Sequence, residues 1–318
     1  MLDEILELDL KIYKFQPKRL PVISGYEAIR ILELINNKKK KADKVDINVA
    51  LGRFPDIPSE ISGDNITFQY LGKNYYLSIS ALERFSKWPH RIFAIEDDQE
   101  KPLMSYSNNH FYQLIALGPR VSPTIEINGI RMHRTEEITP FLDAKLKVLP
   151  LKIFKGAKIL DICTGLGYTS IWVSRLGGDV LTIEKDRNVL ELAEYNPWSY
   201  ELEKIPIILE DALVAITKLP TNYFDRIIND PPRYSLAGEL YSRDFFQEIF
   251  RVLKPGGMLF QYTGNPQEKY RGKKIVKGIM ERLRSVGFRV RQYKKALGLL
   301  CIKPRHTFSD NYEIFRTT

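Results

Sequence analysis

Cysteine and histidine are scarce in this chain, which has two cysteines and four histidines among 318 residues. Cys163 and Cys301 are too few for a disulfide framework. Neither they nor the histidines follow a metal-ligand spacing such as CxxC or HExxH. We therefore expect no disulfide scaffold and no bound metal.

Long hydrophobic runs are also missing. No uninterrupted apolar stretch reaches the ~18 residues that a membrane-spanning helix needs. The N-terminus, Met1-Leu2-Asp3-Glu4, is acidic and lacks the basic start and apolar core of a signal peptide. With 44% hydrophobic and 27% charged residues, the composition is that of a globular protein. We expect a cytoplasmic protein without membrane contact, and the sequence does not predict an oligomeric state.

Positive charge is concentrated at the C-terminal end. The whole chain has a net charge of +9, but residues 251–318 alone hold 16 Lys and Arg against 4 Asp and Glu, a net of +12. A basic segment of this kind favours a polyanionic partner such as RNA. The alternative is a solvated basic surface without a ligand. The residues expected to follow phosphates are Lys269, Arg271, Lys273 and Lys274.

The chain divides into three expected parts. The helical spacing of Tyr26, Ile29, Leu32 and Ile35 predicts a helical N-terminal segment over residues 1–44. Short strand-like runs separated by turn residues predict a small β-rich accessory domain over residues 45–130. The remaining residues, 131–318, are expected to form the catalytic domain.

Strands and helices alternate from Lys158 onward, which demands parallel strands with helices on both faces of the sheet. The last two predicted strands, Phe288–Tyr293 and Leu297–Ile302, are separated by only three residues and should form an antiparallel hairpin. We therefore expect an α/β fold with a seven-stranded, mostly parallel, Rossmann-like sheet that ends in this hairpin. The five earlier strands are expected at Ile159–Cys163, Val180–Glu184, Ile205–Leu209, Phe224–Asn229 and Met258–Thr263.

Three strand ends in this region carry acidic residues suited to a nucleoside. Asp161 lies on a buried strand that runs through a glycine turn into a helix, where backbone N–H groups face a ligand. Its carboxylate suits a cationic amino group. Glu184 ends the second strand and can accept both hydroxyls of a ribose. Asp211 ends the third and can accept from an adenine amino group, while the N–H of Ala212 meets a ring nitrogen.

With these turns in order, residues 140 to 305 resemble the class I S-adenosylmethionine-dependent methyltransferases. The resemblance implies S-adenosylmethionine as the cofactor, with Glu184 at the ribose and Asp211 at the adenine. The alternative is that these are strand-end acids of a Rossmann-like domain with no cofactor role. The complete set of predicted cofactor-binding residues is Asp161, Thr164, Gly165, Gly167, Tyr168, Glu184, Lys185, Asp211, Ala212 and Asn229.

The fourth strand ends in a turn that can accept hydrogen bonds. Pro231 and Pro232 stiffen it and remove N–H donors, leaving carbonyl groups beside the Asp230 carboxylate. The turn resembles the Asp/Asn-Pro-Pro-aromatic motif of methyltransferases that act on exocyclic amines of adenine or guanine. Here Arg233 takes the aromatic position and Tyr234 follows, so either side chain could stack on a base. We predict all five as catalytic residues, the alternative being a rigid turn without a catalytic role.

The stretch from Asp230 to Ser242, with Asn196-Pro197-Trp198-Ser199, is similar to an archaeal-type group of predicted methyltransferases. The leading hypothesis is methylation of a base amine in tRNA or rRNA, an RNA-modification or tRNA-processing activity, with Arg131 and His133 also binding the substrate. One alternative is a methyltransferase or aminopropyltransferase acting on a small metabolite, although the basic C-terminal segment disfavours a cationic polyamine. The other is a noncatalytic nucleic-acid-binding protein with a relic cofactor domain.

Overall fold

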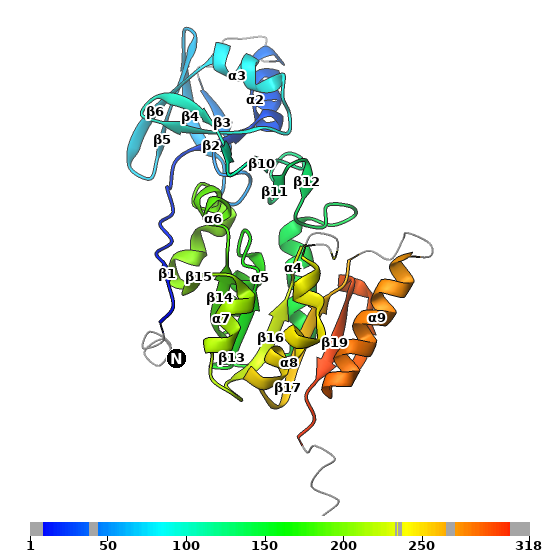
Figure 1. Cartoon of the computed structure of the whole chain (residues 1–318). Coiled ribbons are helices and arrows are strands. Elements are labelled where there is room, and N and C mark those ends of the chain that lie inside the picture. The colour runs from blue at the N-terminus through cyan, green and yellow to red at the C-terminus, as the bar shows by residue number, and fades with distance from the viewer. Residues whose placement is uncertain (1–8, 38–43, 233, 235–236, 265–270, 306–318) are drawn as a thin grey trace, which may run out of the picture.

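The computed structural model describes residues 9–37, 44–232, 234, 237–264 and 271–305. Figure 1 shows an accessory part at the top, in blue to teal, and a catalytic part below it, in green to red. In the described part of the chain, no helix is both long and apolar enough to cross a membrane.

The catalytic part is built on one sheet of eight strands. Its order is β1 (Ile12–Tyr13), β15 (Ile207–Leu209), β14 (Asp179–Glu184), β13 (Lys158–Ile162), β16 (Phe224–Asn229), β17 (Leu253–Tyr262), β19 (Gly298–Ile302) and β18 (Arg289–Tyr293). The strands from β15 to β17 are parallel, and β19 is antiparallel to both β17 and β18. The terminal hairpin therefore lies where the sequence predicts it.

The sheet has one strand more than the seven predicted. Ile12 and Tyr13 pair antiparallel with Ile208 and Ile207, so β1 covers the otherwise open edge of β15. Residues 1–8 and 38–43 of the expected helical segment 1–44 lie outside the described residues, and within the described ones the helix is α2 (Gly25–Asn37). Pro17 and Pro21 exclude a regular helix in the segment before it, because proline removes a backbone donor and clashes with the preceding turn.

Helices cover both faces of the catalytic sheet. On one face α4 (Pro140–Val148), α5 (Tyr168–Arg175) and α6 (Arg187–Ala193) pack over Ile159 and Val180. On the other face α7 (Ala212–Lys218), α8 (Arg243–Val252) and α9 (Arg271–Val286) pack over Leu160 and Leu181. Burial on both faces accounts for the nearly continuous apolar sequences of the central strands.

In its described residues, the accessory part contains three small sheets and the helices α2 and α3 (Ile79–Ser86). The first sheet joins β3 (Lys44–Ile47), β4 (Ile57–Ser62), β5 (Asn65–Tyr70) and β6 (Lys73–Ser78). The second joins β2 (Val22–Ser24), β7 (Ile92–Glu96) and β8 (Gln99–Pro102). The third, called the covering sheet below, joins β9 (Met104–Ser107), β10 (His110–Ile115), β11 (Thr124–Ile127) and β12 (Ile130–Arg131).

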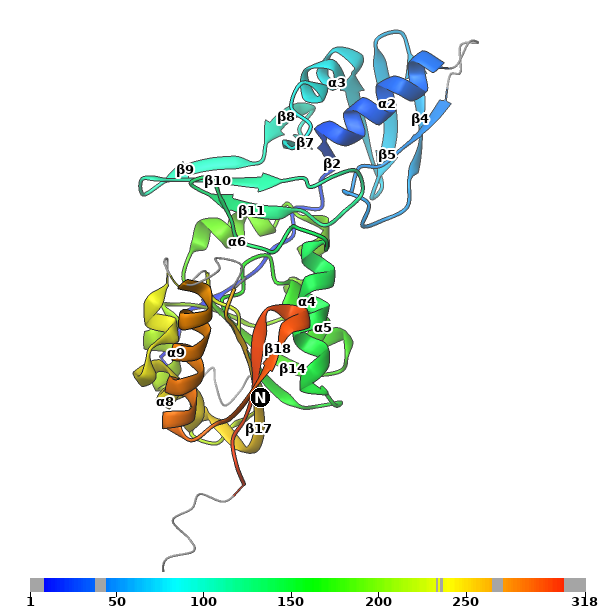
Figure 2. The same ribbon diagram turned by 90° about the vertical axis from the view of Figure 1, so that its right-hand side faces the viewer.

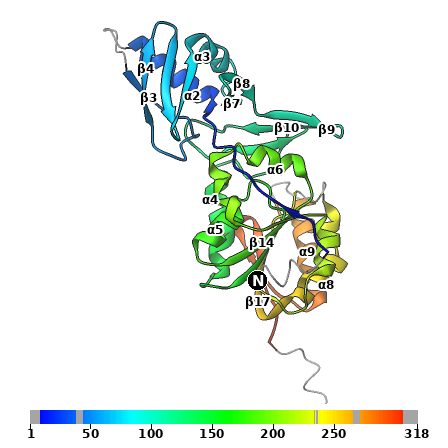
Figure 3. The same ribbon diagram turned by 90° about the vertical axis from the view of Figure 1, so that its left-hand side faces the viewer.

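The covering sheet lies against the catalytic part. Figure 2 shows β9, β10 and β11 extended above α6, and both β9 and β10 contact this helix. Tyr112 of β10 donates a hydrogen bond of 2.7 Å to Asp186, the N-cap residue of α6. Figure 3 shows the N-terminal segment passing along the catalytic part toward β2. There Glu194, just after α6, accepts hydrogen bonds from the Tyr13 hydroxyl and the backbone N–H of Gln16, both of 3.0 Å.

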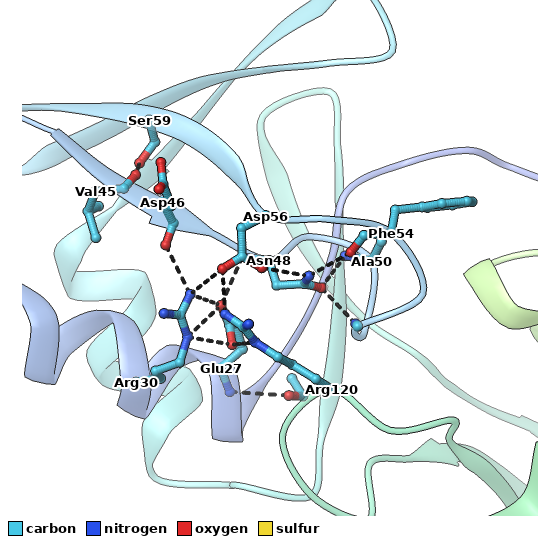
Figure 4. A network of polar contacts seen from close by, with 12 residues as sticks. Glu27, Arg30, Val45, Asp46, Asn48, Ala50, Phe54, Asp56, Ser59 and Arg120 are labelled. Carbon is cyan, nitrogen blue, oxygen red and sulfur yellow. Dashed lines mark hydrogen bonds and ion pairs between the residues drawn. The ribbon is translucent and has the colours of Figure 1, made fainter.

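A polar network holds the connector between β10 and β11 of the covering sheet against the rest of the accessory part (Figure 4). The buried Glu27 carboxylate of α2 accepts from Arg30 at 2.6 Å and from the backbone N–H of Asn48 at 2.8 Å. Arg120, in the connector between β10 and β11, donates to Asp56 at 2.5 Å. Because Asn48 also donates to Asp56, at 3.0 Å, the network joins α2, the loop after β3 and this connector.

Candidate active site

A cavity of about 280 Å³ lies at the carboxyl ends of the central parallel strands. Ile125 and Ile127 of the covering sheet close it on one side, and Pro140 and Ala144 of α4 line another wall. Ligands bind at this edge in open α/β sheets. The predicted site residues that line the cavity are His133, Thr164, Gly165, Tyr168, Glu184, Lys185, Asp211, Ala212, Asp230 and Pro232.

The glycine turn between β13 and α5 has left-handed backbone at three positions. The φ angles are +71° at Cys163, +54° at Gly165 and +76° at Gly167. A Cβ atom on Gly167 would lie 2.4 Å from the side chain of Leu202, so this position requires glycine. A Cβ on Gly165 would meet nothing within 4 Å, so the absence of a side chain leaves room for a ligand.

Glu184 joins the first two strand-end turns. Its carboxylate accepts from the backbone N–H of Gly165 at 2.9 Å and from that of Asp186 at 3.0 Å. Burial raises the pKa of Glu184, and these backbone donors oppose the rise. A carboxylate has about four acceptor positions, so two remain for the hydroxyls of a ribose.

Asp211 lies at the third strand end and caps α7 by accepting from the N–H of Leu213 at 2.9 Å. Its side chain remains 40% exposed, and Lys185 approaches it to 3.9 Å. The carboxylate therefore has acceptor positions left on the cavity side, next to Ala212.

Asp161 is fully buried behind the cavity lining. Its Oδ2 accepts from the hydroxyls of Thr169 at 2.7 Å and Ser170 at 2.5 Å, while Oδ1 is buried without a partner in the described structure. Burial raises the pKa of Asp161 to about 7, against the effect of the two hydroxyl donors. An unpaired carboxylate oxygen beside the glycine turn fits the ammonium group of an S-adenosylmethionine-type cofactor.

Lys147 of α4 occupies the far end of the cavity. Its Nζ lies 2.6 and 2.9 Å from the two Asp230 oxygens and 3.1 Å from Asp143, and 4.7 Å from the ring centre of Tyr262. Burial opposes the charge on Lys147, but Asp230 and Asp143 outweigh it and raise the lysine pKa. Burial also raises the pKa of Asp230, and Lys147 opposes that rise. Lys147 is not among the residues predicted from the sequence, although Asp143 and Lys147 lie four residues apart, a spacing that places two side chains of a helix side by side.

His133 follows β12 and lines the same end of the cavity. Its Nδ1 lies 2.9 Å from Oγ1 of Thr124, and its ring packs 5.3 Å from that of Tyr168. Enclosure by the protein and the charge of Lys147 lower the pKa of His133 to about 3. The imidazole is therefore neutral at physiological pH.

Several predicted site residues do not line the cavity. Asn229 is fully buried and its amide nitrogen donates to Gln261 at 2.7 Å and to the carbonyl oxygen of Leu240 at 3.2 Å. The Tyr234 ring packs 5.3 Å from that of Tyr241 and does not line the cavity. Arg131 is exposed and lies 3.8 Å from Glu126. Gly167 and Pro231 shape their turns without lining the cavity.

The predicted phosphate-binding residues lie partly outside the described part of the chain. Arg233 and Lys269 lie outside the described residues. Arg271 and Lys273 belong to the first turn of α9, and Lys274 of that helix is exposed. None of the described residues of α9 lines the cavity.

Negative charge predominates around the cavity. Its described lining includes two lysines, Lys147 and Lys185, and no group of three or more metal-ligating side chains occurs in the described structure. The five lining carboxylates are those of Glu184, Asp186, Asp211, Asp230 and Glu239. An excess of carboxylates favours a cationic ligand.

Known proteins are similar to the catalytic part in sequence and in fold. A family model described as a methyltransferase domain matches residues 159–257. A polyamine aminopropyltransferase of Mycobacterium tuberculosis is 28% identical over 123 residues, which cover 36% of this chain and 23% of that protein. A spermidine synthase in complex with the transition state analogue AdoDATO shares the fold, with a TM-score of 0.51 and 20% identity over 64% of this chain and 73% of that one.

The similarity extends over most of the chain in one relative. The uncharacterized protein MJ1233 of Methanocaldococcus jannaschii is 47% identical over 277 residues, which cover 86% of this chain and 88% of the relative. The region that matches the methyltransferase domain includes the central strands of the sheet. The acidic cavity at the carboxyl ends of these strands fits an S-adenosylmethionine-type cofactor. The chain therefore belongs to the family of this Methanocaldococcus protein and is an S-adenosylmethionine-dependent methyltransferase.

Proposed function

We propose that the protein methylates an amine nitrogen of a small cationic acceptor, which binds beside Asp230 and Lys147. The observation that carries this proposal is the charge of the cavity, with five carboxylates and two lysines in its described lining. A sulfonium cofactor and a cationic acceptor both gain from such a field, whereas an anionic substrate would be repelled.

In this proposal the cofactor lies across the three strand ends. Glu184 would bind the ribose hydroxyls and Asp211 the adenine amino group. Thr164 and Gly165 would line the methionine part, with the unpaired oxygen of Asp161 toward its ammonium group. When bound, the cofactor supplies a methyl group already activated by the positive sulfur.

The protein must then provide a neutral amine at the right place. The buried Lys147 ammonium would lower the pKa of a neighbouring acceptor amine, because two like charges disfavour each other in a partly dry site. Asp230 would accept one N–H of the amine and direct its lone pair toward the methyl group. The nitrogen lone pair forms the new N–C bond, and the electrons of the broken C–S bond remain on sulfur. The extra proton on nitrogen passes to the Asp230 carboxylate and then to water.

The size of the cavity supports a small acceptor. Ile125, Ile127 and His133 of the accessory part line it, and its volume of about 280 Å³ lies near the lower end of the ~300–1,000 Å³ of typical ligand pockets. Methylation of an RNA base amine remains the second candidate, supported by the Asp-Pro-Pro turn and the +12 charge of residues 251–318.

A methyl-transfer assay in which small amines and RNA are separated before counting distinguishes these candidates. The full chain is incubated with methyl-labelled S-adenosylmethionine, a mixture of polyamines and total RNA, and the label in each fraction is measured. We expect label in the amine fraction. Label only in RNA would replace this proposal with the second candidate, and product formed only from the decarboxylated cofactor would indicate aminopropyl transfer.

A pair of variants tests whether the cavity is the reacting site. Asp230→Asn should abolish labelling, whereas Asp244→Asn, an exposed acid of α8, should leave it unchanged. Equal labelling by both variants would contradict the proposed role of Asp230.

A further inference from the structure

The hydroxyl of Thr124 lies within hydrogen-bond distance of Nδ1 of His133, a residue that lines the cavity. Thr124 is fully buried at the start of β11, and its hydroxyl donates to the carbonyl oxygen of Ile125 at 3.3 Å. The hydroxyl oxygen, Oγ1, lies 2.9 Å from Nδ1 of His133. Because a hydroxyl has only one hydrogen, both hydrogen bonds form together only when Nδ1 donates to Oγ1. In that arrangement Nδ1 carries the proton.

The other ring nitrogen of His133 then has a free lone pair. A neutral imidazole with its proton on Nδ1 is an acceptor at Nε2. The described structure gives Nε2 of His133 no protein partner, and the residue lines the cavity. Lys147 faces the ring from α4 and Tyr168 from α5, and the lysine charge disfavours the imidazolium form. His133 thus offers the cavity a permanent acceptor.

Asp230 and His133 approach the cavity from different elements. Asp230 follows β16 of the catalytic sheet, whereas His133 follows β12 of the covering sheet. Both line the same cavity, and Lys147 interacts with each of them. The cavity lining therefore includes a possible acceptor from each part of the chain.

We infer that His133 accepts one N–H of a primary amine acceptor while Asp230 accepts the other. This inference rests on the proposed function and names its substrate class. A primary amine in this arrangement has both hydrogens held and only its lone pair left to face the methyl group. The accessory part thereby contributes a catalytic residue to the active site.

The same arrangement sets the extent of methylation. After transfer and loss of one proton, the product is a secondary amine with a single N–H. That product cannot satisfy both acceptors, and an acceptor left unpaired in a partly dry site is costly. The enzyme should therefore release a monomethylated amine rather than methylate it twice.

Nitrogen NMR tests the ring directly. The chain has four histidines, so protein with ¹⁵N-labelled histidine gives few signals, and His133→Gln identifies the one of interest. We expect the Nδ1–H form for His133, and a mixture of both forms in Thr124→Val, which keeps the shape of Thr124 but lacks its hydroxyl. An Nε2–H form or an imidazolium in the wild-type protein at pH 7 would overturn the inference.

Ligand binding separates the inference from the proposed function. The probes are sinefungin, as a cofactor analogue, and putrescine, a primary diamine, with binding heats measured alongside the spectra. We expect sinefungin alone to leave Nε2 unchanged and putrescine to shift it. Absence of a putrescine heat would count against the proposed small-amine function. A heat without an Nε2 shift would overturn the role of His133 alone, and a shift with sinefungin alone would make it a cofactor ligand.

Product analysis completes the test. His133→Gln and His133→Ala should lower turnover of a primary amine by about 5- to 100-fold, the usual effect of losing one hydrogen bond to a reacting group. Both should also raise the share of dimethylated product. Unchanged turnover and an unchanged product ratio in folded variants would contradict the inference.

Discussion

Lys147 and Asp230 form a buried ion pair that joins helix α4 to the end of strand β16. The lysine Nζ lies 2.6 Å from Oδ2 and 2.9 Å from Oδ1, and only 6% of the lysine side chain is exposed. Because the pair lines the cavity, stability and catalysis share these two residues.

Replacing Lys147 should therefore impair both properties. Lys147→Met leaves the carboxylates of Asp230 and Asp143 without their cation, and breaking a buried pair on one side costs about 3–5 kcal/mol. Urea denaturation should show this loss, and activity should fall with it. The double variant Lys147→Met with Asp230→Leu should recover part of the stability but none of the activity. If Lys147→Met were as stable as the wild type, the ion pair would make no net contribution to the free energy of unfolding.

Asp230 should matter for transfer rather than for cofactor binding. Asp230→Asn keeps the shape but weakens acceptance of the amine hydrogen and of the released proton. We expect at least a 100-fold loss of turnover and a cofactor Kd within about threefold of the wild type. Single-turnover rates and calorimetry with sinefungin measure the two quantities. A large change in the cofactor Kd would place Asp230 in the cofactor site instead.

Glu184 and Asp211 should determine cofactor affinity. Loss of either carboxylate leaves ligand hydroxyl or amino donors unpaired, typically a cost of about 1–3 kcal/mol, or about 5- to 150-fold in Kd. Glu184→Ala and Asp211→Ala can be compared by calorimetry with Asp179→Asn, an exposed acid at the opposite end of β14. Unchanged binding in both site variants would contradict the cofactor assignment.

Asp161 should make stability depend on pH. Its native pKa of about 7 lies above the unfolded value of about 3.9, so the native state binds more protons between these limits. The unfolding free energy should therefore fall as pH rises from about 4 to 7, by at most about 4 kcal/mol. Asp161→Asn should remove this slope in urea denaturation at pH 5 and pH 8. Parallel pH profiles for the two proteins would show that the carboxyl is not protonated in the native state.

Cys163 should tolerate glycine better than a branched side chain. Its φ of +71° is a left-handed conformation that costs a residue with a Cβ about 1–2 kcal/mol. Cys163→Val should be less stable than Cys163→Gly by about 1–3 kcal/mol, because β-branching worsens the clash. Thermal unfolding of the two variants checks the order, and a more stable valine variant would refute the strain.

The sequence predicts that several residues of the expected cofactor site lie close together, because short-range rules govern their placement. A strand, a glycine turn and a helix are adjacent in the chain, so Gly165 lies beside the carboxyl edge of the sheet once β13 forms. The three acids follow three strands of one parallel sheet, which brings Glu184 and Asp211 to the same cavity.

The acceptor side depends on contacts between distant segments. Nothing near Lys147 in the sequence reveals that Asp230, 83 residues away, neutralises it. Stacking of Tyr234 on a substrate base stays a prediction. In the structure the Tyr234 ring packs against the ring of Tyr241. Strand β1 escaped prediction because two residues held by backbone hydrogen bonds leave no side-chain pattern to detect.

The position of β1 also determines how the accessory part is attached. The chain enters the catalytic sheet at Ile12–Tyr13, leaves to build the accessory part, and returns through α4 to β13. In topology the accessory part is thus an insertion between two strands of one sheet, held by two chain segments rather than one. Two attachments restrict the motion of the accessory part relative to the catalytic part more than a single linker would. A fragment beginning at residue 131 would lose both the cover and an edge strand of the sheet beneath it.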